Sequence, residues 1–168
     1  MLPACAVKVV VPIQRGAQHV RARTGCRRRS PVSLKALAEG ARLVRMSGGE
    51  LHVITIVDRP LGHLPYYAKY YDAEALQAAA LKAADDILSK ARDVVAEYAV
   101  PATYQRVSME TAGEEVADRI EREADAVKAD AIVMGTHSRR GVRRLMLGSV
   151  AEGVLQSSQR PVLLVRDL

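Results

Sequence analysis

The sequence predicts a single α/β domain built around a mostly parallel sheet. Short apolar runs rich in β-branched residues alternate along the chain with amphipathic segments, and this alternation is typical of βαβ units with right-handed crossovers. The first run, residues 7–13 (VKVVVPI), is almost continuously apolar, as expected for a strand covered on both faces. A length of 168 residues with 49% hydrophobic content suits one domain with a sizeable core.

The elements of the first half follow from local signals. Ser30-Pro31 predicts a helix start, because Ser caps helices and Pro suits the first helical position, and this helix should end at residues 47–49. Residues 51–57 (LHVITIV) have the composition of a buried strand. Between residues 73 and 99 the apolar positions recur at spacings of three and four, which predicts one long amphipathic helix.

The second half repeats the alternation. Residues 101–107 form a strand whose polar content suggests a sheet edge. The pattern of residues 111–114 (TAGE) predicts a capping box before a helix that runs to Asp130. The apolar strand 131–134 follows, a second capping box is predicted at residues 149–152 (SVAE) before the last helix, and residues 161–165 (PVLLV) form the final strand.

The positive charge of the chain belongs to one segment. Residues 14–29 contain six arginines and no acidic residue; removing these six from the 25 basic residues leaves 19 against 19 acidic ones. The segment is an atypical Arg-rich insertion, since connections in α/β units usually have about 2–6 residues. With 4% aromatic residues and no Trp or Phe, the chain lacks the stacking platforms of single-strand binders, so nucleic acid is disfavoured as a partner.

Several other classes of protein are excluded by what the sequence lacks. No apolar run approaches the roughly 18 residues of a membrane span, and the start of the chain does not have a signal-peptide layout. Cys5 and Cys26 are too few for a disulfide framework or a zinc site. The sequence therefore predicts a cytoplasmic protein with no membrane partner and no metal centre.

The stretch most suited to ligand binding is residues 130–150 (DAIVMGTHSRRGVRRLMLGSV). An apolar strand ends at Gly135, and a polar loop leads to Gly148-Ser149 and a helix start. A helix start offers unpartnered N–H groups and the positive end of the macrodipole, which suits phosphate. On these residues alone, Gly148-Ser149 could equally be a plain helix start and Gly135 a plain turn.

The spacing in this stretch resembles the nucleotide-binding signature of the universal stress protein family. Two residues separate Gly135 from Ser138, and nine residues separate Ser138 from Gly148-Ser149; the family has Gly in place of Ser138. The resemblance implies one domain over residues 1–168 with a three-layer α/β/α, Rossmann-like (adenine nucleotide alpha hydrolase-like) fold. Its five-stranded, mostly parallel sheet would have strand order 3-2-1-4-5, and the C-terminal strand would join two subunits into a homodimer.

The same resemblance implies where a nucleotide would lie. In such sheets the ligand crevice lies at the carboxyl ends of the strands where their order reverses, so the ends of the first and fourth strands should meet there. The implied ligand is ATP, with AMP or ADP as alternatives, with or without Mg. The base would lie near Pro12, Ile13 and Ile56, the ribose near Met134 and Gly135, and the phosphates near Ser138, Gly148, Ser149 and Val150, with Arg139 adding positive charge.

Two departures from the family pattern bear on this site. Family members have an acidic residue after the first strand, where this chain has Gln14 in one alignment and Arg28-Arg29 in another. An insertion that adapts the site, a loss of nucleotide binding, and a stretch read in the wrong frame all explain the difference. Ser138 would cost about 1 kcal/mol if its position needs positive φ, although its hydroxyl could donate to a phosphate.

Two functions follow. The first is a universal stress protein that binds an adenine nucleotide as a non-catalytic regulatory ligand and acts on an unknown protein partner. No Walker-type motif, metal cluster or catalytic triad is present in the sequence, so any turnover is at most a slow ATPase or autophosphorylation. The alternative is a dimeric stress-response interaction protein of the same fold that has lost nucleotide binding.

Overall fold

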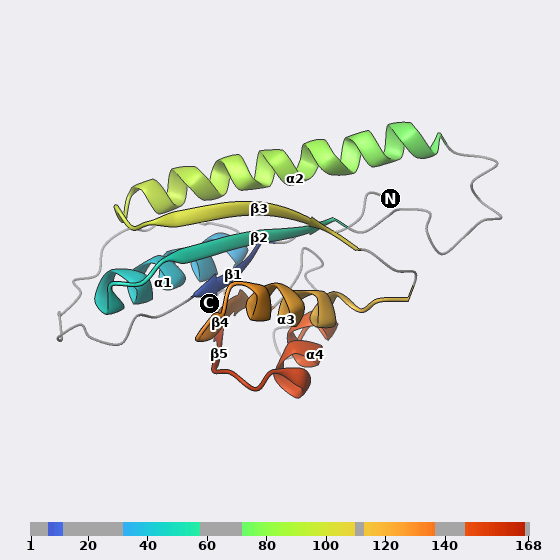
Figure 1. Ribbon diagram of the computed structural model, residues 1–168. Helices are drawn as coiled ribbons and strands as arrows, with labels where there is room; N and C mark the ends of the chain where they lie inside the picture. Colours follow the sequence, from blue (N-terminus) through green and yellow to red (C-terminus); the bar gives the residue numbers. More distant parts are fainter. Residues whose placement is uncertain (1–6, 12–31, 58–71, 110–112, 137–146, 167–168) are drawn as a thin grey trace.

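The computed structural model describes residues 7–11, 32–57, 72–109, 113–136 and 147–166. They form three layers, in which a sheet lies between helices α1 and α2 on one face and α3 and α4 on the other (Figure 1). The helices are α1 (Val32–Ser47), α2 (Ala73–Ala96), α3 (Val116–Ala126) and α4 (Ser149–Ser157). The alternating α/β architecture predicted from the sequence is confirmed.

Five strands form one sheet in the order β3-β2-β1-β4-β5. Strand β2 pairs in parallel with β3, and β4 pairs in parallel with β5. The strands are β1 (Val7–Val11), β2 (Leu51–Val57), β3 (Ala102–Ser108), β4 (Ala131–Gly135) and β5 (Val162–Val165).

Strand β1 runs antiparallel to both of its neighbours. Val7 lies opposite Thr55, and Val11 lies opposite Ala131 at the start of β4. The expectation that the carboxyl ends of the first and fourth strands meet is therefore wrong. The sequence VKVVV carries no directional signal, because a strand covered on both faces has the same apolar pattern in either sense. Direction is normally imposed by a short connection to the next helix, whereas residues 12–31 separate β1 from α1.

The helix starts differ from two of the predictions. Helix α2 is the long helix expected, and the Asp72 side chain caps it by accepting from the Ala75 N–H at 3.0 Å. The predicted capping boxes at residues 111–114 and 149–152 are wrong. Helix α3 begins only after Gly113, whose φ of +89° is incompatible with an α-helix, and α4 has Gly148 as its N-cap with no side-chain cap bond.

Alternating side chains divide the core between the two faces of the sheet. Leu51, Val53 and Val133 pack with α1 and α2, whereas Ile54 and Ile132 pack with α3 and α4. All seven residues of β2 are buried, as the sequence predicted for this strand. Among the described residues, no helix is long and apolar enough to cross a membrane.

Candidate functional site

One backbone hydrogen bond joins the end of β4 to the start of α4, and a second joins the end of β4 to β5. The Thr136 N–H donates to the Val165 carbonyl of β5 at 3.0 Å, and the Gly148 N–H donates to the Thr136 carbonyl at 2.9 Å. Thr136 is buried, so these bonds are shielded from water. They bring Gly135 and the Gly148-Ser149 pair together, as the spacing of the sequence motif implied. We call this place the β4–α4 junction.

Helix α4 begins at the junction without a side-chain cap. Gly148 has φ −70° and ψ 145°, and its carbonyl accepts from the Glu152 N–H at 2.9 Å, which closes the first turn. The N–H groups of the first turn have no acceptor within the helix, and they carry the positive end of its dipole. Ser149 is exposed there, and Val150 is half-buried. The geometry suits an anionic group at this helix start.

Two residues expected to contact the base and ribose belong to the core. Met134 is 0% exposed and Ile56 is 5% exposed, and Val150 packs against the same apolar cluster. These side chains thus form an apolar layer beneath the junction. Gly135 is half-buried at the end of β4. The other four residues expected at the site lie outside the described part of the chain: Pro12, Ile13, Ser138 and Arg139.

The first strand approaches the junction from the unexpected direction. Because β1 is antiparallel to β4, its last residue, Val11, pairs with Ala131, which lies at the opposite end of β4 from Gly135. Among the described residues, the carboxyl end of β1 therefore contributes nothing to the β4–α4 junction.

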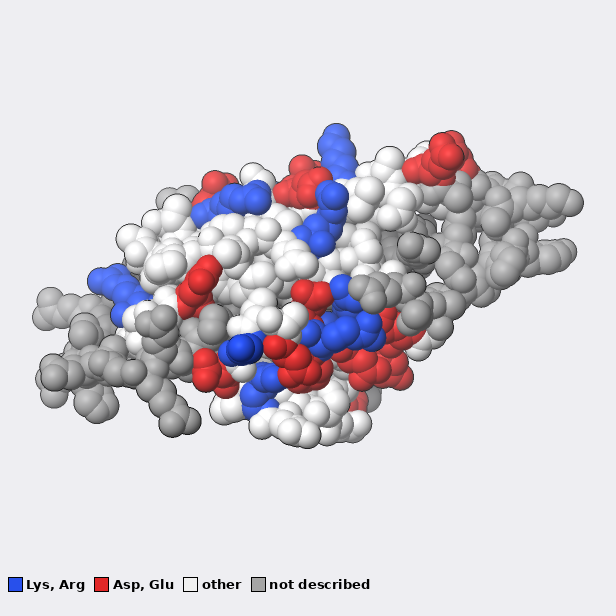
Figure 2. Space-filling view, in the orientation of Figure 1, with Lys and Arg blue, Asp and Glu red and all other residues white. Residues whose placement is uncertain are grey.

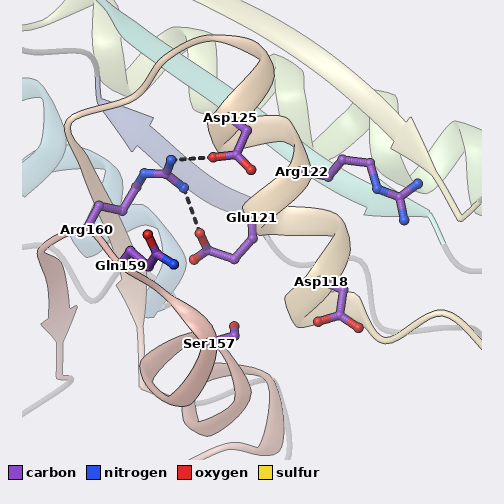
Figure 3. Close-up of a pocket in the computed structure, with 7 residues that line it drawn as sticks. All are labelled: Asp118, Glu121, Arg122, Asp125, Ser157, Gln159 and Arg160. Carbon is purple, nitrogen blue, oxygen red and sulfur yellow. Dashed lines mark hydrogen bonds and ion pairs between the residues drawn. The ribbon is translucent and has the colours of Figure 1, made fainter.

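A polar groove that the sequence reasoning missed lies between α3 and the turn after α4 (Figure 3). Its volume is about 410 Å³. Mixed charges gather over this part of the surface (Figure 2). The only local signal was the spacing of carboxylates along one face of α3. The groove is lined by Asp118, Glu121, Arg122, Asp125, Ser157, Gln159 and Arg160.

Arg160 holds the groove together. Its Nη1 donates to Glu121 Oε2 at 2.7 Å, its Nη2 donates to Asp125, and its Nε donates to the Ala129 carbonyl at 3.1 Å. The hydrogen bond to Asp125 is the main cause that raises the pKa of Arg160; the charges of both acids add to it, and burial opposes it. Because Arg160 is paired with both acidic side chains, these residues form a structural ion-pair network that lines the groove. Within the described residues, no group of three His, Cys, Asp or Glu side chains is placed to hold a metal ion.

The three layers, with a helix that begins at a glycine N-cap after the fourth strand, define an α/β domain with alternating strands and helices. The profile described as "Universal stress protein family" matches residues 28–166, a stretch that leaves out β1. Universal stress protein MJ0531 of Methanocaldococcus jannaschii is 30% identical over 138 residues, which cover 82% of this chain and 76% of that protein. The chain belongs to the universal stress protein family, as its motif indicated.

Solved structures share the fold. The universal stress protein UspA of Lactobacillus plantarum has a TM-score of 0.67 at 20% identity, with 83% of this chain and 92% of that chain covered. The universal stress protein of Archaeoglobus fulgidus, solved in complex with dAMP, has a TM-score of 0.55 at 23% identity over the same shares.

Proposed function

We propose that this universal stress protein binds an adenine nucleotide at the β4–α4 junction as a non-catalytic regulatory ligand in the stress response. The ligand is ATP, or AMP or ADP in its place, with or without Mg. The observation that carries the proposal is the start of α4, which has no side-chain cap among the described residues and which the Gly148–Thr136 hydrogen bond holds beside the end of β4. The N–H groups of its first turn have no acceptor within the helix, and this arrangement suits a phosphate. The complex of the Archaeoglobus relative with dAMP supports an adenine nucleotide as the ligand.

A second candidate is a dimeric interaction protein of the same fold that has lost nucleotide binding. The direction of β1 favours it, because the last described residue of the strand, Val11, pairs with Ala131, at the end of β4 away from the junction. In this case the protein acts through its surfaces alone.

In both cases we propose a cytoplasmic homodimer that pairs through β5 and acts on a further protein partner. Strand β5 is an edge strand, and Leu163 on it is 40% exposed. An edge strand with an exposed apolar side chain is suited to pairing with its copy in a second subunit.

Thermal unfolding with and without Mg-ATP separates the two candidates. At about 100 times the dissociation constant, one-site binding should add about 2.7 kcal/mol, which is a shift of roughly 5–10 °C for a domain of this size. Gly148→Ala and Gly148→Val should reduce the shift progressively, because each places more side-chain volume at the helix start. The φ and ψ of Gly148 suit any residue, so both variants should fold.

The exposed Gln156 lies in α4 well beyond its first turn and provides the control. Gln156→Ala should keep the full shift. Absence of a shift in the unmodified protein at millimolar ATP would favour the interaction protein without nucleotide.

A further inference from the structure

Among the described residues, Thr136 connects the edge strand β5 to the start of α4 through its backbone hydrogen bonds. The Val165 carbonyl at the end of β5 accepts from the Thr136 N–H, and the Thr136 carbonyl accepts from the Gly148 N–H. Gly148 therefore keeps its place beside β4 through a residue that β5 also holds. If β5 detaches, the Thr136 N–H loses the Val165 carbonyl as its acceptor. Thr136 is then held less firmly, and so is Gly148, the N-cap of α4, which is bonded to it.

Strand β5 is the part of the sheet best suited to detach. It has four residues, none of them fully buried, and among the described strands it pairs with β4 alone. The opposite edge strand, β3, is longer and includes the buried Val107. Short, exposed segments with few buried apolar side chains open at lower free energy than the core.

Arg160 fastens the other end of β5. Arg160 and Pro161 are the two residues directly before β5. The Arg160 side chain is bonded to Glu121 and Asp125 of α3 and to the Ala129 carbonyl before β4. Beside it, the Ile132 N–H donates to the Pro161 carbonyl at 2.9 Å. One ladder of four paired residues, Ile132↔Val162 to Gly135↔Val165, connects the Arg160 end to the Thr136 end.

We infer that docking of β5 and ligand binding at the β4–α4 junction are coupled, with Thr136 as the connection and Arg160 as the residue that holds β5 docked. This inference rests on the proposed function, because the ligand is the adenine nucleotide proposed above. A nucleotide that requires the ordered start of α4 binds the docked form, so it suppresses detachment of β5. The nucleotide thereby controls how firmly the edge strand is presented to a second subunit.

Amide hydrogen exchange measured by NMR on the full chain tests the coupling. The reporter is the Ile132 N–H, which lies three residues along β4 from Gly135, about 10 Å away, and beyond direct contact with a phosphate at α4. The Leu51 N–H is its matched control, since it donates at 2.9 Å to Pro101, the residue before the other edge strand. AMP at about 100 times its dissociation constant should slow Ile132 exchange by up to about 100-fold and Leu51 exchange much less.

The possible results separate the two proposals. Equal slowing of Ile132 and Leu51 would mean general stabilisation and would overturn the coupling. Bound AMP, verified by calorimetry in the same samples, with an unchanged Ile132 rate would overturn the coupling while the proposed function stands. If none of ATP, ADP and AMP binds at any concentration, both proposals are overturned.

A variant tests the connection without any ligand. Arg160→Met should speed amide exchange of Ile132, Thr136 and Gly148 by roughly tenfold or more, because it removes the bonds to Glu121 and Asp125 that hold the start of β5 against α3. Arg106→Met removes an exposed ion pair with Asp85 beside β3 and should leave these three rates unchanged. If Arg160→Met speeds Ile132 but not Gly148, the Thr136 connection is wrong.

Discussion

Replacing Arg160 by Met should destabilise the protein far more than replacing Arg106 by Met, although each arginine bonds an acidic residue of a helix. The side chains of Arg160 and Glu121 are 19% and 16% exposed, whereas those of Arg106 and Asp85 are 38% and 60% exposed. Methionine keeps most of the apolar stem in both cases, so the comparison isolates the charged groups.

The expected magnitude follows from the contacts that each substitution removes. Arg160→Met removes a charge-assisted bond to the mostly buried Glu121 and a bond to the Ala129 carbonyl, and its bond to Asp125 counts little because that carboxylate is 69% exposed. Together these contacts contribute about 3 kcal/mol. The exposed Arg106–Asp85 pair contributes about 0–1 kcal/mol. For a domain of this size, the Tm should fall by roughly 6–12 °C in Arg160→Met and by less than about 4 °C in Arg106→Met.

Urea unfolding at neutral pH measures both differences on one scale. The m-values should match that of the parent protein, which shows that the same surface is exposed on unfolding. The pKa of Arg160 is raised in the folded state, chiefly by its hydrogen bond to Asp125, so its contribution is complete at neutral pH and is lost only as the pH rises through the folded pKa. Equal losses in the two variants, or a loss below about 1 kcal/mol in Arg160→Met, would refute the reasoning from burial.

Three further predictions concern packing, backbone strain and pH. A Cβ on Gly153 would lie 2.8 Å from the Ala117 Cβ, so Gly153→Ala should lower the free energy of unfolding by about 1–2 kcal/mol. Adding Ala117→Gly to this variant should recover part of the loss. Additive losses in the double variant would contradict the contact. Lys128 has φ +52°, so Lys128→Gly should raise stability by about 1 kcal/mol in urea, whereas a loss would show that its side chain stabilises the turn. Burial raises the pKa of Tyr104, and the positive charge of Arg92, 4.9 Å from the ring, opposes this rise. The stability that the protonated Tyr104 contributes is therefore present below pH about 10 and lost above it. Between pH 9 and 11 the parent protein should lose more stability than Tyr104→Phe, and equal losses would contradict this assignment.

The sequence predicted those features that local patterns encode. The mostly apolar, β-branched composition of β2 and the spacing of three and four in α2 identify a buried strand and a long helix without reference to other segments. The Gly135 to Gly148-Ser149 spacing likewise indicated the family and the β4–α4 junction.

Other features depend on contacts between distant segments. The apolar pattern of β1 fits either direction, so its antiparallel pairing has no local signature. The helix starts at Glu115 and Gly148 were misplaced because TAGE and SVAE match a capping box, while a positive φ at Gly113 and the bond from Gly148 to Thr136 decide otherwise. The groove joins Arg160 to Glu121 across 39 positions, which no local pattern predicts.

An NMR titration of the isotope-labelled protein with AMP tests the central claim most directly, because it locates the ligand residue by residue. Nucleotide at the β4–α4 junction should produce its largest amide shift changes at Gly135, Gly148, Ser149 and Val150, and Gly148→Val should abolish them. Saturation without change at these four amides, with changes centred instead on the groove around Arg160, would contradict the account. The absence of any change at millimolar AMP and at millimolar ATP would contradict it as well.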